Sequence, residues 1–549
     1  MTESGTLAPV EAQPETQTPP RAMPEVRART TSLQRLAAIP PHHLVALGVF
    51  AGLLVVLLAW NWDAVAHPIH EHGDAAANSI LIDRAKSFDL FHGNYSRFGF
   101  YHPGPAFLSV QAGSEALLHD LLDVVPTPFN AHLVGVLVLN SALVALSAGV
   151  FARSTRSWAA GMALAVMAVA YGWILAGSLA DTWLPMLYIW PFLLLLVSAA
   201  SLFTGDGTDL WKFVLAASLL VHGHVAFSMF AVVFSAAVAL AWVRRYGRDS
   251  IGRIPTRSGI AAALILAAFV APIVIEVALD FPGQLDEYVG YDRPAAESPR
   301  DLGAVLQFLF AYWAPEQGGI AFGVTASLGA LALADRSRPT TKRRYLLSVL
   351  AAAGLGWILA AVYAGFVVDD LREVYTTYFF TAVPVVVTAV LLTEVVGTFG
   401  SSGAKVVRAG TVALLVIGAL FVASRGGLDS RYPGIPSVGA GHEALEAVLD
   451  PGEPVSFLFE EPEWPLAVGL VEQARRADRP VCAEVEGGLF EPEVEAAFIV
   501  VFTEEELCTP DQVAASREIF VGRPGLEMPG RPLFADGAMV LNDLSAGES

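Results

Sequence analysis

Cysteine and charge are both scarce in this sequence. Among 549 residues there are only two cysteines, and charged side chains make up 16% of the chain. There is no CxxC pair, no Cys/His spacing of the kind that binds zinc, and no lipidation motif. There is also no basic stripe with interleaved aromatic residues, and the formal net charge is −20. These absences exclude a disulfide-rich scaffold, a zinc domain and a nucleic-acid-binding protein.

Apolar residues dominate instead. The hydrophobic fraction is 54% and the mean hydropathy is +0.54. A chain of this length could form several soluble domains, but this composition is typical of an integral membrane protein. The acidic excess is concentrated near the C-terminal end, where residues 425–549 contain 24 acidic and 8 basic side chains, a net charge of −16. The sequence that precedes them is therefore close to neutral.

Hydropathy and basic clusters together predict the topology. Residues 1–40 are rich in Pro, Thr, Glu and Ala without apolar periodicity, which predicts a disordered N-terminus. Arginines at positions 21, 27, 29 and 35 precede the first span and place this end in the cytoplasm. Eleven spans are predicted, at 44–62, 130–152, 158–177, 183–203, 211–224, 225–243, 259–279, 320–334, 345–368, 375–396 and 407–424. An odd number of spans puts the C-terminal domain outside the cytoplasm.

The expected fold is therefore mostly α, with about eleven transmembrane helices in residues 41–425 and a small extracytoplasmic α/β domain in residues 426–549. Two large outer loops are predicted, at 63–127 and 280–317. Within the first, residues 106–122 are apolar but interrupted by Glu115, His119 and Asp120, which favours a helix at the membrane interface over a span. In the C-terminal domain, strands are expected at 454–459, 481–485 and 496–502, and a helix at 464–478. This domain is expected to cover or shape a site.

Cys482 and Cys508 both fall in the C-terminal domain. One disulfide between them and two buried free thiols are both compatible with the sequence.

The first outer loop contains the strongest candidate site, in the stretch from Asp74 to Pro105. A carboxylate such as Asp74 can deprotonate an acceptor hydroxyl, and the later Tyr/Arg/His-rich turn can donate hydrogen bonds to a leaving phosphate. The turn residues in question are Tyr95, Arg97, Tyr101 and His102. An amphipathic helix is predicted at 76–88 from its apolar spacing. The alternative for Asp74 is a structural role as the N-cap of that helix.

The pattern of this loop resembles the first outer loop of GT-C superfamily glycosyltransferases. An acid after the first span, a helical run, a Gly-Asn turn and then Tyr-His-Pro-Gly-Pro is similar to the arrangement in lipid A aminoarabinose transferases and protein O-mannosyltransferases. The segment YSRFGFYHPGP also resembles the corresponding segment in a group of actinobacterial GT-C-type membrane proteins. The resemblance implies a GT-C-like fold, a catalytic-base role for Asp74 and the basic position of the turn for His102. Several of these families carry adjacent acids here, whereas Asp74 is followed by Ala75.

Other candidates lie outside this stretch, each with a structural alternative. By the resemblance, Asp181 occupies the place of a second acid in the second outer loop, although it could be a solvated loop residue. His224 is a candidate for substrate contact or an interfacial histidine with satisfied hydrogen bonds. Arg372 could bind a lipid phosphate or form an interfacial salt bridge. His70 and His72 lie close to Asp74 and are weak candidates for a divalent metal site, so no cofactor is predicted with certainty.

These observations favour an inverting membrane glycosyltransferase at the outer face of the plasma membrane. Its donor would be a polyprenyl-phosphate sugar and its acceptor an envelope glycan, lipid or protein, with membrane lipids as surroundings and no nucleic acid as partner. A transporter or lipid flippase is the alternative from another class, but it predicts ionisable groups at mid-membrane, whereas here polar residues gather in the outer loops. A non-catalytic GT-C-like scaffold of an envelope-assembly complex is the third hypothesis.

Overall fold

The computed structural model describes residues 40–96, 100–290, 300–313, 318–334, 340–398, 430, 432, 434–485, 508–525 and 530–545. The predicted disordered N-terminus, the predicted span at 407–424 and the predicted strand at 496–502 lie outside these residues.

The chain is mostly helical up to residue 398. The α-helices there are α2 (Pro41–Trp60), α3 (Trp62–Ala66), α4 (Gly73–Lys86), α5 (Ala106–Glu115), α6 (Pro128–Thr155), α7 (Trp158–Ile174), α8 (Leu184–Leu187), α9 (Ile189–Phe203), α10 (Leu210–Gly223), α11 (Phe227–Tyr246), α12 (Thr256–Leu279), α13 (Gln284–Gly290), α14 (Leu302–Ala311), α15 (Gly318–Ala334), α16 (Thr340–Phe366) and α17 (Ala382–Thr398). A π-helix, η1 (Ala116–Leu121), continues α5, and 3-10 segments occur at η2 (Gly207–Asp209), η3 (Gly247–Asp249), η4 (Ile251–Arg253) and η5 (Val374–Thr381).

Each of the ten predicted spans within the described residues coincides with a helix. Seven of these helices are long and apolar enough to cross a membrane. The other three, α7, α10 and α15, have 17, 14 and 17 residues. A bilayer needs roughly 20 residues of helix, so these three are short for a full crossing. The chain is therefore a multi-pass membrane protein by composition and helix length, and the count of eleven spans stays a prediction.

Helix α9 forms the centre of the helical part. Every residue from Ile189 to Leu202 is buried, and α9 contacts α6, α10, α11, α16 and α17. The sequence IWPFLLLLVSAASL is apolar on all sides, as expected of a helix that has no exposed face. Three phenylalanines, Phe192, Phe230 and Phe379, contact one another edge to face and join α9 to α11 and η5.

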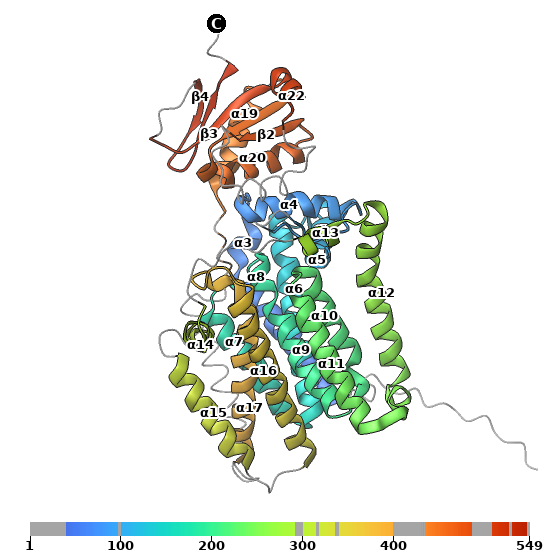
Figure 1. Ribbon diagram of the computed structural model, residues 1–549. Helices are drawn as coiled ribbons and strands as arrows, with labels where there is room; N and C mark the ends of the chain where they lie inside the picture. Colours follow the sequence, from blue (N-terminus) through green and yellow to red (C-terminus); the bar gives the residue numbers. More distant parts are fainter. Residues whose placement is uncertain are drawn as a thin grey trace, which may run out of the picture. The chain divides into compact units, whose positions relative to one another are not determined.

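Helix α12 shows the opposite pattern and marks the lipid-facing surface. It lies beside α10, and most of its surface is uncovered (Figure 1). Its apolar side chains are exposed, among them Ile260, Leu264 and Leu279 at 57%, 67% and 73%. A contiguous exposed apolar surface of this kind is stable in hydrocarbon and not in water.

The C-terminal part contains a five-stranded sheet with helices. Its helices are α19 (Pro436–Glu446), α20 (Trp464–Arg476), α22 (Pro510–Ala515) and the 3-10 turn η6 (Glu461–Glu463), and its strands are β1 (Val455–Phe459), β2 (Val481–Val485), β3 (Arg517–Gly522), β4 (Arg531–Ala535) and β5 (Val540–Asp543). The strand order is β2-β1-β3-β5-β4. Strand β1 is parallel to both β2 and β3, and the β3–β5 and β5–β4 pairs are antiparallel. The predicted strands at 454–459 and 481–485 and the helix at 464–478 correspond to β1, β2 and α20.

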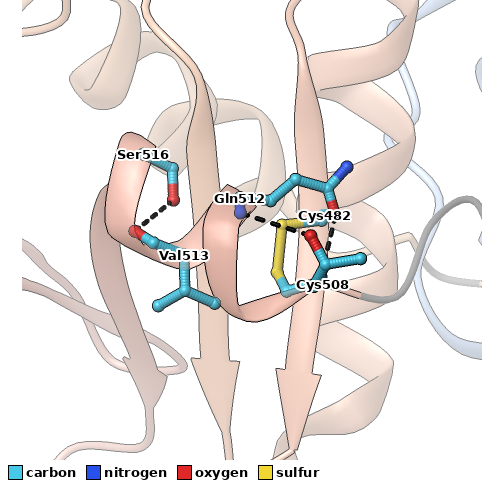
Figure 2. The surroundings of a disulfide bond; sticks show 6 residues. Cys482, Cys508, Gln512, Val513 and Ser516 are labelled. Carbon is cyan, nitrogen blue, oxygen red and sulfur yellow. Dashed lines mark hydrogen bonds between the residues drawn. A yellow bond between two sulfur atoms is a disulfide. The ribbon is translucent and has the colours of Figure 1, made fainter.

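Cys482 and Cys508 form a disulfide in this domain (Figure 2). Cys482 lies in β2, and Cys508 lies just before α22, where its N–H donates to the carbonyl of Ala483 at 3.2 Å. The Thr509 and Gln512 side chains form a capping box that begins α22 directly after the disulfide. The bond therefore ties the start of α22 to the edge strand of the sheet.

Helix α4 is covered on two sides, which corrects the prediction of an amphipathic helix. Ala76, Ala77 and Ile80 belong to the core of the C-terminal domain and lie against α20. Leu81 and Ile82 pack instead with residues of α5. Figure 1 shows α20 between the sheet and α4. The apolar spacing alone suggests one buried face, but two separate hydrophobic clusters contain residues of this helix.

A buried ion cluster joins the same elements. Glu115 of α5 is fully buried and accepts from Lys86 at 2.6 Å, from His132 of α6 at 2.7 Å and from Arg476 of α20 at 2.7 Å. Burial alone would raise the pKa of Glu115, but the hydrogen bonds from His132 and Arg476 outweigh it and lower the pKa. Arg476 also pairs with the buried Glu472. Glu115, one of the three polar residues that interrupt the apolar run at 106–122, is thus an anchor for the C-terminal domain.

We predict that Arg476→Ala weakens the attachment of the C-terminal domain. The change leaves Glu115 with fewer partners and Glu472 without its guanidinium, and removing one member of a buried ion pair costs about 3 kcal/mol or more. A lower apparent melting temperature and faster release of the domain by limited proteolysis in detergent would follow. The exposed Arg531→Ala is the matched control and should behave as wild type. Equal behaviour of the two variants would contradict the anchoring role.

Candidate functional site

The Asp74 carboxylate is held by two hydrogen bonds from distant parts of the chain. Its Oδ1 accepts from the Tyr95 hydroxyl at 2.5 Å, and its Oδ2 accepts from the Trp183 indole Nε1 at 2.9 Å. Asp74 lies in the first turn of α4, where the helix dipole also stabilises a negative charge. The alternative of an N-cap is wrong, because the N-cap is His72 and no side chain caps the helix.

Two cavities meet at this carboxylate. Both are lined by Asp74, Asn78 and Trp183. The first cavity, of about 390 Å³, has further polar groups from Asp181, His72, His132 and Gln111, and is also lined by Tyr432, Trp464 and Pro465 from the C-terminal sequence. The second cavity, of about 540 Å³, is lined by aromatic and apolar side chains such as Tyr188, Leu184 and Met229, and by polar groups of Asn94, Ser96, His102, His224, Asp369 and Thr376.

Asp181 lines the first cavity together with Asp74, so the structure brings the two predicted acids to one site. The Asp181 side chain is buried, and its Oδ1 accepts from the Trp183 backbone N–H at 3.0 Å. Burial raises the pKa of Asp181, and the backbone hydrogen bonds oppose that shift. Trp183 therefore contacts one acid through its indole and the other through its backbone, which fixes their relative positions.

Residues 94–96 and 100–102 pair as the two arms of a hairpin that leads into α5. Tyr95 and Tyr101 pair as an antiparallel bridge, Ser96 N–H donates to the Phe100 carbonyl at 2.7 Å, and His102 N–H donates to the Asn94 carbonyl at 2.9 Å. Burial, and then the Asp74 charge, raises the pKa of Tyr95, so its hydroxyl stays a donor. Arg97 lies outside the described residues, although Ser96 and Phe100 on either side of it both line the second cavity.

Tyr101 is not among the residues that line either cavity; its backbone anchors α13 instead. Its N–H donates to the Gln284 side chain at 2.6 Å, and its carbonyl accepts from the Tyr288 hydroxyl at 2.5 Å. Its ring lies tilted against that of His92, with 3.7 Å between the ring centroids. Tyr101 therefore links the two outer loops, since α13 belongs to the second, and its substrate contact stays a prediction.

His102 and His224 lie side by side in the second cavity, with 4.2 Å between their ring centroids. Burial, together with the neighbouring His224, holds the pKa of His102 well below its usual value. His102 is thus a neutral imidazole that acts by hydrogen bonding, which differs from the positive charge expected for the basic position of the turn. Its Nδ1 is buried without a hydrogen-bond partner in the described structure.

Arg372 is not among the residues that line either cavity. Its side chain is 74% exposed, and its guanidinium pairs with Asp370 at 2.7 Å. In this structure Arg372 therefore forms a salt bridge, which was the alternative to binding a lipid phosphate.

The two histidines proposed as weak metal ligands have other contacts. His72 Nδ1 lies 2.7 Å from the Tyr432 hydroxyl, and the ring of His70 packs closely against Gly439. Within the described residues, no group of three His, Cys, Asp or Glu side chains is placed to hold a metal ion. Both Asp74 oxygens also accept hydrogen bonds from protein groups.

Sequence reasoning missed Trp183, Tyr432 and Asn78. Asn78 follows Asp74 by four residues, so helical spacing alone would have put it on the same face; its Oδ1 is buried without a partner in the described structure. Trp183 stands two residues after Asp181, but its indole contact with Asp74 depends on tertiary packing. Tyr432 contacts His72 across 360 residues, and no local pattern signals that contact.

No known protein-family profile matches the chain, and no curated protein sequence matches it. Among solved structures, the chain is similar to the archaeal oligosaccharyltransferase AglB from Archaeoglobus fulgidus, solved in complex with an inhibitory peptide and a dolichol-phosphate. The two are 12% identical, the match covers 87% of this chain and 69% of the other, and the TM-score is 0.40. A likeness of that degree says nothing about the activity of this chain, which has to be inferred from its own site.

We predict that Gly104→Ala disrupts the hairpin and the second cavity. A Cβ at Gly104 would overlap the imidazole of His222, and that ring cannot easily move because its Nε2 lies 2.6 Å from the Phe269 carbonyl. Overpacking of this kind costs about 1–3 kcal/mol, and a lower apparent melting temperature would show it. Gly113→Ala in α5 is the control, since no atom lies within 4 Å of the point that its new Cβ would occupy. A Gly104→Ala protein that melts like wild type would contradict the packing argument.

Proposed function

We propose that the chain is a membrane glycosyltransferase that moves a sugar from a polyprenyl-phosphate donor to a hydroxyl group of an envelope glycan, lipid or protein. In this proposal Asp74 is the general base. One observation carries it: the Asp74 carboxylate lies where two cavities meet. A group-transfer enzyme has to bring two dissimilar substrates to one catalytic group, and this arrangement supplies that geometry.

The character of each cavity suggests which substrate it takes. In the second cavity, Leu184, Val225 and Met229 offer apolar contact to a prenyl chain, and the neutral imidazoles of His102 and His224 offer hydrogen bonds to its phosphate. The first cavity offers the polar groups of Asp181, His132 and Gln111 and is lined in part by residues of the C-terminal domain, which suits an acceptor that arrives from the aqueous side.

The proposed reaction is a single displacement. The acceptor hydroxyl oxygen attacks the anomeric carbon, the bond from that carbon to the phosphate oxygen breaks, and polyprenyl phosphate leaves. Asp74 takes the hydroxyl proton, and the configuration at the anomeric carbon inverts. Tyr95 and Trp183 each occupy one acceptor position on the carboxylate, which leaves a lone pair on each oxygen for the incoming proton.

The charge of the leaving phosphate needs donors from the protein. Among the described residues that line the second cavity there is no Lys or Arg. Of these residues, only neutral hydrogen-bond donors can therefore stabilise the leaving phosphate. Arg97 and Arg372 stay the predicted cations, and Arg97 stands between two lining residues in the sequence.

We place this reaction at the outer face of the plasma membrane, with the N-terminus cytoplasmic and the C-terminal domain extracytoplasmic. The disulfide between Cys482 and Cys508 supports this orientation, because disulfides persist in oxidising compartments and are rare in the cytoplasm. The arginines that precede the first span support it as well.

The central prediction concerns Asp74→Asn. Purified protein in vesicles is given a panel of radiolabelled polyprenyl-phosphate sugars with envelope acceptors, and transfer is measured. Loss of a general base lowers kcat/KM by about 10²–10⁴-fold, so Asp74→Asn should reduce transfer to that extent while binding of polyprenyl phosphate persists. Asp63→Asn is the matched control, since Asp63 is exposed in the segment that precedes α4.

Equal transfer by wild type and Asp74→Asn would remove Asp74 from the base role. Donor movement across the vesicle without transfer would favour the transporter or flippase, and lipid binding with neither transfer nor movement would favour the scaffold.

A second prediction separates positioning from binding. Tyr95→Phe and Trp183→Phe each remove one charge-assisted hydrogen bond to Asp74, which is worth about 1.5–3 kcal/mol. Because the carboxylate is then less well oriented, kcat should fall at least tenfold with little change in KM. Tyr246→Phe removes one tyrosine hydrogen bond at the far end of α11 and should leave both constants unchanged. A rise in KM alone would show that Tyr95 and Trp183 bind substrate and do not position the base.

A further inference from the structure

A third cavity, separate from the candidate site, lies between the end of α11 and the start of α16. Its volume is about 610 Å³. Arg244 of α11 and Arg343 and Arg344 of α16 line it, and between them lie apolar side chains such as Leu240 and Leu347. We call this the α11–α16 arginine groove. It shares no lining residue with the two cavities at Asp74. Helix α11 separates the groove from Ala226, which lines the second cavity, and its 20 residues give it a length of about 30 Å.

We propose that the α11–α16 arginine groove binds an anionic phospholipid. Three arginines line one cavity, and guanidinium binds phosphate oxygens in a bidentate manner. The hydroxyls of Thr340 and Ser348 line the same cavity and add neutral donors.

The apolar part of the groove favours a lipid over a soluble phosphate. Leu240 and Leu347 are 50% and 43% exposed, and they stand on helices that are long and apolar enough to span a membrane. A basic pocket at the ends of two spans, continuous with exposed apolar surface, receives a phosphate group at the interface and an acyl chain along the helices. A free phosphate ion would use the arginines but leave the apolar surface unfilled.

The experiment compares anionic and zwitterionic lipids on the full-length protein. Purified protein in neutral detergent is titrated with phosphatidylglycerol or with phosphatidylcholine of the same acyl chains, and retained lipid is counted by native mass spectrometry. Each basic residue near an anionic lipid surface contributes about fivefold to binding. The triple variant Arg244→Gln, Arg343→Gln, Arg344→Gln should therefore bind phosphatidylglycerol about a hundredfold more weakly than wild type.

The matched control is the triple variant Arg245→Gln, Arg253→Gln, Arg257→Gln. These arginines are also exposed near the same end of α11 and the start of α12, but they do not line the groove. The control should keep its affinity within about twofold. Ala351→Trp fills the exposed apolar side of the groove and should weaken lipid binding at least tenfold with every arginine in place. The Arg→Lys version of the first triple keeps the charge and should bind at an intermediate level.

Three results would overturn the proposal. Equal losses in the two Gln triples would show binding to general surface charge, and equal retention of phosphatidylcholine would show no headgroup selection. Displacement of the lipid by millimolar inorganic phosphate, with Ala351→Trp unaffected, would show an ion site without an acyl-chain groove.

Discussion

The buried carboxylate of Glu115 is the constraint on which the functional half of the molecule depends. A charge in a buried position is tolerated only when it is fully paired, and here Lys86, His132 and Arg476 supply the partners. These partners come from α4, α6 and α20, so satisfying one charge requires three helices to meet. The same requirement sets the position of the C-terminal domain over α4.

The location of Asp74 follows from that arrangement. Helix α4 carries Lys86 at its end and Asp74 in its first turn, and both of its apolar sides are occupied. A helix held in this way cannot rotate, so the carboxylate presents its oxygens to Tyr95 and Trp183 in a fixed orientation. Preorganisation of this kind favours general-base catalysis, because folding has already oriented the carboxylate and the reaction requires no further ordering of it.

The distribution of polar groups differs between the two ends of the helical part. At one end, acids, tyrosines and histidines surround two cavities and are covered in part by Trp464 and Pro465. At the other end of α11 and at the start of α16, arginines surround an open groove with apolar walls. The first environment suits chemistry on a charged lipid substrate, and the second suits the retention of an anionic lipid from the surrounding bilayer.

The sequence alone determined the positions of the membrane helices within the described residues, because a span leaves a long apolar run that can be read locally. It also identified Asp74 as a candidate, since an acid beside a span is costly and stands out, whereas Asp181 became a candidate through the resemblance. Tertiary structure alone decided their partners. Trp183 and Tyr432 reach the site from far along the chain, α4 is buried on two sides where its spacing suggests one, and burial keeps His102 neutral. Each of these outcomes depends on which elements pack together, and the apolar pattern of a single segment carries no information about that.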